Sequence, residues 1–147
     1  MNAVQVQVVG AALVRDAQVL AARRTAPAHL AGLWEFPGGK VEPGESDEQA
    51  LVRELAEELA VTVAVGGRVG PELALGEHAV MRVYVCALLD GEPTAGEHDA
   101  LRWLSADELH EVPWIPADAP VLGPLASQLR GMSRPSPRGG AARRDPG

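Results

Sequence analysis

The segment from Ser46 to Leu59 most constrains how this chain can fold. Ser46 is a favourable helix N-cap, and Gln49 three positions later completes the pattern of a capping box. Leucines then recur at four-residue spacing, at Leu51, Leu55 and Leu59. This spacing places one apolar stripe along a helix. The pattern predicts an amphipathic helix over 47–59 whose leucine face packs against the rest of the protein.

Segments with strand character lie on both sides of this predicted helix. Alternating valines, β-branched runs and flanking turn residues predict strands at 4–14, 18–23, 34–36, 61–65, 79–89 and 101–104. The run at 79–89 is the longest and is expected to be the most central. Two further helices are expected, a short one at 105–109 and a final one at about 118–130, with Asp118 as N-cap and Pro120 in its first turn. This order predicts an α+β fold, a mixed β-sheet between helices in an α-β-α sandwich.

Length and charge exclude several classes of protein. A chain of 147 residues fits one domain, expected over 1–130, and the Pro-, Gly- and Arg-rich remainder at 131–147 is expected to be disordered. Residues 1–130 carry nine basic and nineteen acidic side chains, which disfavours nucleic acid as a partner. No apolar run reaches membrane-spanning length and no signal peptide is evident, so a cytoplasmic protein without membrane contact is expected, as a monomer.

Three carboxylates of the predicted helix share one face. Glu54, Glu57 and Glu58 fall within an arc of roughly 100° when residues follow each other at 3.6 per turn. Like charges at this spacing repel. They are tolerated on a solvated acidic face, or where a divalent cation lies among them. An oxygen-only set of ligands favours a hard ion, Mg²⁺ with Mn²⁺ as a substitute.

The residues around these carboxylates decide between the two interpretations. From Gly39 the sequence runs G-x5-E-x7-R-E-L-x-E-E-x-A-V, which resembles the 23-residue signature of the Nudix hydrolases at eight of nine defined positions. The departure is Ala60, where the family has glycine. Because an alanine is costly in the left-handed conformation that a helix end often requires, we expect a loss of about 1 kcal/mol there or a different helix exit. Segments up to about residue 130 also resemble MutT-type enzymes and the related CTP pyrophosphohydrolases.

The resemblance implies a Nudix fold and the hydrolysis of nucleoside triphosphates to monophosphate and pyrophosphate. It implies metal ligation by the Gly38 carbonyl and by Glu54, Glu57, Glu58 and a later acid, Glu97 in preference to Asp99. Glu54 is alternatively the base for the attacking water, and Glu57 and Arg53 complete the catalytic set, with Arg53 bracing the helix through Glu45. Between the two later acids lies His98, which is expected on the surface.

The resemblance further implies substrate contacts from Arg24, His29, Lys40 and Asp118. An ionised Asp118 only accepts hydrogen bonds, so it favours a base edge with donors, as in guanine, 8-oxoguanine or cytosine derivatives. Cleansing of 8-oxo-dGTP is the main expectation, and cleavage of CTP or 5-methyl-dCTP is the alternative. A non-catalytic nucleotide-binding module is a third possibility, but such modules often lack the glutamates that are all present here.

Overall fold

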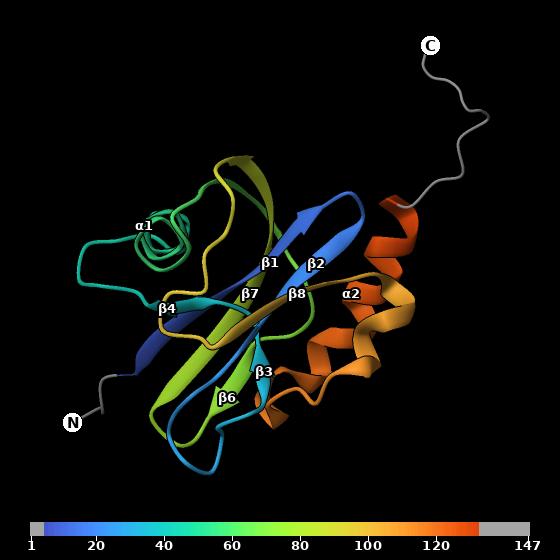
Figure 1. Ribbon diagram of the computed structural model, residues 1–147. Coiled ribbons are helices and arrows are strands. Elements are labelled where there is room, and N and C mark those ends of the chain that lie inside the picture. The colour runs from blue at the N-terminus through green and yellow to red at the C-terminus, as the bar shows by residue number, and fades with distance from the viewer. Residues whose placement is uncertain (1–4, 133–147) are drawn as a thin grey trace, which may run out of the picture.

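The computed structural model describes residues 5–132, which form an eight-stranded mixed sheet with a helix on each face (Figure 1). The expected disorder at 133–147 lies outside the described residues. The elements run, in order, β1 (Val6–Arg15), β2 (Gln18–Arg23), β3 (Trp34–Glu35), β4 (Gly38–Lys40), α1 (Asp47–Leu59), β5 (Thr62–Arg68), β6 (Leu73–Leu75), β7 (Ala79–Asp90), β8 (Ala100–Leu104), the 3₁₀ helices η1 (Ala106–Glu111) and η2 (Pro116–Asp118), and α2 (Ala119–Met132).

The sheet is organised around two long strands, β1 and β7. They pair in parallel, from Val6 with Ala79 to Val14 with Ala87, and every other pairing between named strands is antiparallel. The main strand order is β3-β2-β1-β7-β5, with β4 added to β1, β6 to β7 and β8 to β2. The expectation that 79–89 would form the longest strand is confirmed by β7, but the most central position belongs to its parallel neighbour β1.

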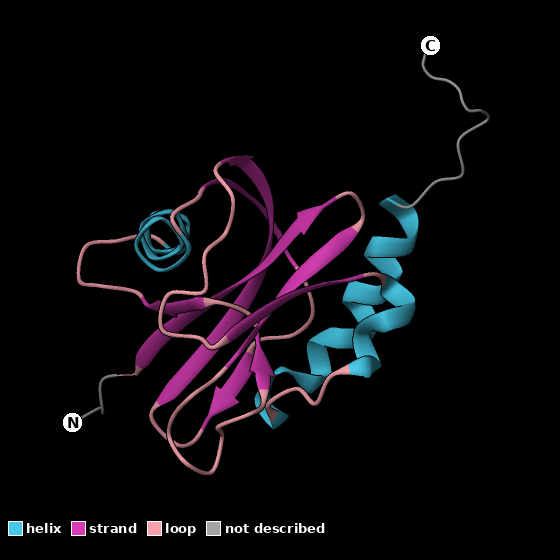
Figure 2. Cartoon of the chain, viewed as in Figure 1, coloured by secondary structure: helices cyan, strands magenta, loops and turns pink. Residues whose placement is uncertain are grey.

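Each face of the sheet has its own apolar core, and Figure 2 shows helices on both sides of the sheet. On one face the buried leucines of α1 pack against Val9, Leu13 and Leu20. On the other face α2 contributes Val121, Leu125 and Leu129, which pack with aromatic residues of the loops and strands. This arrangement confirms the predicted mixed sheet between helices. No helix within 5–132 is long and apolar enough to cross a membrane.

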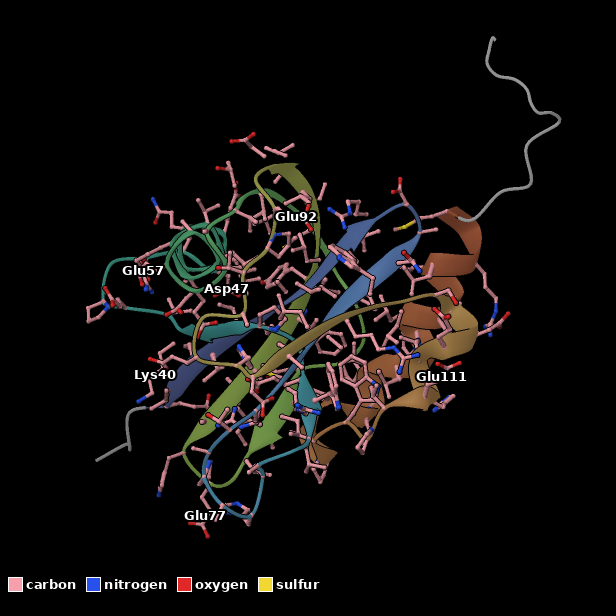
Figure 3. All side chains as sticks on the ribbon, viewed as in Figure 1. Lys40, Asp47, Glu57, Glu77, Glu92 and Glu111 are labelled. Atoms are coloured by element: carbon pink, nitrogen blue, oxygen red, sulfur yellow. The ribbon has the colours of Figure 1, made fainter. Side chains whose placement is uncertain are left out.

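Helix α1 follows its sequence signals closely. Both hydrogen bonds of the capping box between Ser46 and Gln49 are present, and the helix spans the predicted residues. Asp47 in its first turn accepts hydrogen bonds from Tyr84, at 2.5 Å, and from Arg82, at 3.2 Å, both on β7. These contacts attach the start of the helix to β7, and Figure 3 shows Asp47 beside α1.

Helix α1 is capped at its end by Ala60, with the left-handed backbone conformation for which the family has glycine. Ala60 has φ 63° and ψ 37°, the left-handed conformation, and its N–H bonds to the Leu55 carbonyl. The chain therefore leaves the helix through a left-handed residue, as it would with glycine, and the alanine at this position is conformationally strained.

Several predicted boundaries were wrong. The short strands β4 and β6 were expected as turn or loop, and residues 131–132, placed in the tail, belong to α2. The final helix starts at Ala119, because Asp118 closes a preceding 3₁₀ turn and its carboxylate bonds to the backbone of Phe36 instead of capping α2. The short helix after β8 is also a 3₁₀ helix, and it extends to Glu111.

Candidate active site

A cleft of about 310 Å³ opens beside the second half of α1. Its walls come from β1, the β3–β4 segment, the loop that follows β2, Glu58 of α1 and the loop 91–99 that precedes β8. Four residues singled out from the sequence line it, namely Arg24, Gly38, Glu58 and Glu97. The cleft therefore joins Gly39 and Glu58, near the two ends of the signature, with residues far from it in the chain.

Two glycines bring backbone to the edge of this cleft. At Gly39, an added Cβ atom would lie 2.5 Å from the Glu54 carboxylate, so the strand β4 and this side chain are in direct contact. At Gly38, where φ is +159°, an added Cβ would collide with the Val9 carbonyl of the neighbouring strand β1. Side chains at either position would displace β4 from the carboxylate helix. The steric requirement explains the first glycine of the signature, Gly39, and the glycine directly before it.

Arg53 holds the carboxylates of the signature together. Its guanidinium pairs with Glu45 at 2.6 Å and with Glu54 at 3.0 Å, and it reaches Glu57 at 3.4 Å. Another of its N–H groups donates to the Lys40 carbonyl, so the loop after β4 is bound to the helix. The hydrogen bond from Arg53 lowers the pKa of Glu45 to about 2. The expected bracing pair of Arg53 and Glu45 is confirmed as a contact.

Glu58 differs from the other two helix carboxylates in its surroundings. Its Oε1 is buried and has no hydrogen-bond partner among the described residues. Burial raises the pKa of this carboxyl group, and the nearby imidazole of His98 acts in the opposite direction. Glu57, in contrast, is 63% exposed and projects from α1 away from the strands (Figure 3). Glu54 lies between these extremes, at 17% exposed.

The side chain of His98 is buried, and the expectation of a surface histidine was wrong. It is 7% exposed, and its Nε2 lies 2.9 Å from Glu35 Oε2. The hydrogen bond to Glu35 raises the pKa of His98, and the charge of Glu58 acts in the same direction against the effect of burial. Glu35 also pairs with Arg24 at 2.6 Å. Sequence reasoning missed Glu35 and His98 as cleft residues. The available signal for His98 was its place between the two candidate acids Glu97 and Asp99, and Glu35 had none.

Asp118 is fully buried beneath the cleft wall, at 1% exposed. One carboxylate oxygen accepts a hydrogen bond from the Phe36 N–H at 3.2 Å, and the other has no partner within 5–132. Burial raises the pKa of Asp118 to about 7, although the Phe36 N–H opposes this. Burial therefore favours the acid form of Asp118, which donates as well as accepts, beside the ionised form from which the base preference was argued. Asp118 does not line the cleft, but the residue to which it is hydrogen-bonded, Phe36, does.

The remaining predicted residues are distributed unevenly. His29 and Lys40 are exposed and do not line the cleft, and Lys40, the last residue of β4, lies at the edge of the molecule (Figure 3). Of the two acids in the loop 91–99 that were candidate ligands, Glu97 lines the cleft, whereas Asp99 is bound to Arg23 at 2.6 Å. The structure thus brings Arg24, Glu58 and Glu97 together and leaves His29 and Lys40 apart.

The carboxylates fit a divalent cation by their chemistry, although within 5–132 no three potential ligand side chains are gathered closely enough to hold one as they stand. The buried Oε1 of Glu58, which has no hydrogen-bond partner among the described residues, is the oxygen that a bound cation would satisfy most directly. The Gly38 backbone and the carboxylates of Glu54 and Glu97 supply further oxygens around the same cleft. Oxygen ligands with several negative charges are the set that Mg²⁺ and Mn²⁺ prefer.

This combination of sheet, carboxylate helix and cleft agrees with the comparisons with known proteins. Residues 4–124 match the NUDIX domain, and the chain belongs to the NUDIX family. Its relatives and their structures place it more narrowly, as a Nudix hydrolase of the MutT type.

Among the relatives, a Mycobacterium tuberculosis protein named "Putative 8-oxo-dGTP diphosphatase 2" is 51% identical over 129 residues, which are 86% of this chain and 92% of that protein. The CTP pyrophosphohydrolase of Escherichia coli is 44% identical, over 80% of this chain and 88% of its own. Among solved structures, the solution structure of the E. coli ORF135 protein superposes with a TM-score of 0.73 at 41% identity, and covers 91% of this chain and 96% of that one.

Proposed function

We propose that this protein hydrolyses nucleoside triphosphates to the monophosphate and pyrophosphate with a divalent cation, and that 8-oxo-dGTP is its main substrate. The observation that carries the proposal is the buried, unpartnered oxygen of Glu58 in a cleft that Arg24 also lines. Such a cleft offers a place for a cation and a guanidinium for a phosphate within one binding site. The names of the two relatives above support a nucleotide substrate.

The ligands for the cation are proposed to be Glu57, Glu58, Glu54, the Gly38 carbonyl and Glu97. A bound Mg²⁺ neutralises phosphate charge and polarises the phosphoryl oxygens. Because Asp99 is already paired with Arg23, whereas Glu97 lines the cleft, the geometry favours Glu97 as the acid from the loop 91–99. Arg53 keeps Glu54 and Glu57 oriented through its hydrogen bonds.

Glu54 is the best-placed base for the attacking water, if it is not itself a ligand. Its carboxylate touches the Gly39 backbone at the cleft edge and is held by Arg53 at 3.0 Å. Water adds to a phosphorus of the triphosphate as its proton passes to a carboxylate. The bond to the bridging oxygen breaks, which releases the monophosphate and pyrophosphate.

Asp118 is proposed to read the base from beneath Phe36. Because burial raises the pKa of Asp118 to about 7, its acid form is favoured beside the carboxylate, and the group can present either a donor or an acceptor. The N1–H and N2–H edge of 8-oxoguanine fits the acceptor form, and so does the N4 amine of cytosine. The second candidate, a CTP or 5-methyl-dCTP pyrophosphohydrolase, is favoured by the 44% identical relative of that name.

A substrate panel tests the proposal and ranks its two versions. We expect pyrophosphate release from 8-oxo-dGTP to exceed that from dGTP, CTP, dCTP and 5-methyl-dCTP in kcat/KM, with no turnover in EDTA and recovery with Mg²⁺ or Mn²⁺. Full turnover in metal-free buffer would contradict the mechanism. A higher kcat/KM for a cytosine nucleotide would select the second candidate.

The biological role that follows is sanitation of the nucleotide pool. Hydrolysis of 8-oxo-dGTP removes an oxidised precursor before DNA replication incorporates it and before DNA repair must remove it. We further propose that the protein acts in the cytoplasm, as a monomer, on free nucleotides. Light scattering at the concentrations used for the assay tests the oligomeric state.

A further inference from the structure

Three side chains form a continuous chain of contacts across one wall of the cleft. Arg24 Nη1 donates to Glu35 Oε1 at 2.6 Å, and Glu35 Oε2 lies 2.9 Å from His98 Nε2. Both oxygens of Glu35 are therefore engaged, each by a different residue. Because an ionised carboxylate only accepts hydrogen bonds, His98 Nε2 carries the proton in this pair.

Because Glu35 is shared between two partners, it engages only one guanidinium nitrogen of Arg24, and this determines which nitrogens are free to bind a ligand. Arg24 Nε donates to the Ala26 carbonyl at 2.9 Å and Nη1 donates to Glu35. Within 5–132, the structure shows no hydrogen-bond partner for Arg24 Nη2. The guanidinium is thus held by two contacts and retains one nitrogen, at the cleft, for a phosphate oxygen.

His98 reaches Glu35 from a loop that is fastened on both sides of the cleft. On the side of α1, the Thr94 N–H donates to the Leu59 carbonyl at 2.9 Å, and Gly96 packs against the Glu58 carbonyl. On the side of β2, Asp99 pairs with Arg23 at 2.6 Å. The position of the imidazole is therefore fixed by the backbone around it as well as by Glu35.

We propose that His98 is a positioning residue for Arg24, which it controls by occupying the second oxygen of Glu35. This inference rests on the proposed function, in which Arg24 binds a substrate phosphate. A carboxylate with both oxygens available prefers a two-point pair with arginine. Without His98, Glu35 turns both oxygens toward Arg24, which engages Nη2 and withdraws it from the phosphate.

The test is a set of steady-state measurements on the best substrate of the panel. His98→Leu removes the donor, and His98→Ser shortens the side chain, so that its hydroxyl lies too far from Glu35 to replace Nε2, without adding an apolar group. We expect each to raise KM about tenfold, with kcat within twofold of wild type, since a contact made equally in ground and transition states is lost. His98→Gln keeps an N–H donor and should restore most of the KM. His110→Leu, at an exposed histidine, is the matched control.

A double-mutant cycle separates an effect through Arg24 from a general loss of structure. In an Arg24→Ala background, the His98 substitutions should leave KM unchanged, and melting temperatures are recorded for every variant. A tenfold rise that persists without Arg24, or a loss confined to kcat, would overturn the proposal. So would a Gln variant as impaired as the Ser variant.

The same cycle is repeated on the binding of a non-hydrolysable α,β-methylene nucleoside triphosphate, followed by calorimetry. This arm does not depend on turnover. If the wild type binds the analogue but hydrolyses no triphosphate, the proposed function fails while the coupling of His98 to Arg24 is still measured. If the analogue binds and the substitutions of His98 change its affinity equally with and without Arg24, the positioning role fails alone.

Discussion

The buried carboxyl group of Asp118 should be visible in the pH dependence of stability. Its pKa is about 7 in the folded protein and close to 3.8 in an unfolded chain, so the folded state binds more protons between these values. Stability from this group is therefore complete below pH 4 and lost as the pH rises toward 7. At about 1.4 kcal/mol per pKa unit, the loss amounts to a few kcal/mol.

Asp118→Asn isolates this contribution. The amide oxygen can still accept from the Phe36 N–H, but the side chain no longer ionises. We expect the variant to be more stable than wild type at pH 8, with the difference shrinking toward pH 5, in urea unfolding at both values. Other titrating groups, such as Glu45, are common to both proteins and cancel. A difference that does not depend on pH would contradict the assigned burial effect.

The two neighbouring carboxylates of α1 should respond differently to neutralisation. Glu57→Gln and Glu58→Gln are each expected to lower kcat about 100-fold or more, the scale of a lost electrostatic stabiliser. Only Glu58→Gln should also raise the melting temperature, because its oxygen is buried without a partner, whereas Glu57 is 63% exposed. Activity assays and thermal unfolding of both variants check this. A variant that stays active but melts earlier would mark its residue as structural.

At the scale of single elements, the end of α1 offers a stabilising substitution. Ala60 is exposed and adopts the left-handed conformation, so Ala60→Gly removes conformational strain and no packing. We expect stability to rise by about 0.5–1 kcal/mol, net of the greater freedom of glycine in the unfolded chain. Ala56→Gly, at an exposed position inside the same helix, should instead cost about 1 kcal/mol. Equal effects at both positions in urea unfolding would contradict the explanation.

How well each element was predicted from sequence follows from how local its determinants are. Helix α1 was predicted to the residue because its cap and its leucine stripe lie within the segment itself. Strands β4 and β6 contain three residues each and exist through pairing with β1 and β7, which a local pattern cannot reveal.

The same distinction holds within the candidate site. The shared face of the helix carboxylates could be predicted because helical spacing fixes it, and the pairing of Arg53 with Glu45 was implied by the family resemblance. The burial of His98 and the turn of Asp118 toward Phe36 depend on segments 63 and 82 residues away in the chain. No local pattern carries that information.

For the whole molecule, binding of a divalent cation should appear as a change in stability. The chain carries a formal charge of −7, and the acidic groups around the cleft make a bound cation favourable only in the folded state. We expect MgCl₂ to raise the melting temperature to a plateau, as binding linkage requires. NaCl at matched ionic strength is the control for screening. A Glu57→Gln, Glu58→Gln double variant should lose the Mg²⁺ effect, and an unchanged response would place the cation elsewhere.

The parallel pairing of β1 with β7 has a consequence for how the protein is made. Strand β1 pairs with β7, which begins at Ala79. These two strands can therefore pair only after more than half of the chain has been synthesised. Until β7 is present, the sheet surface against which the leucine face of α1 packs is incomplete. Non-local pairing of this kind slows folding, because chain entropy is lost before the contacts that compensate for it form. A ribosome-bound chain stopped before β7 should therefore be readily digested by protease, and one extended through α2 should resist.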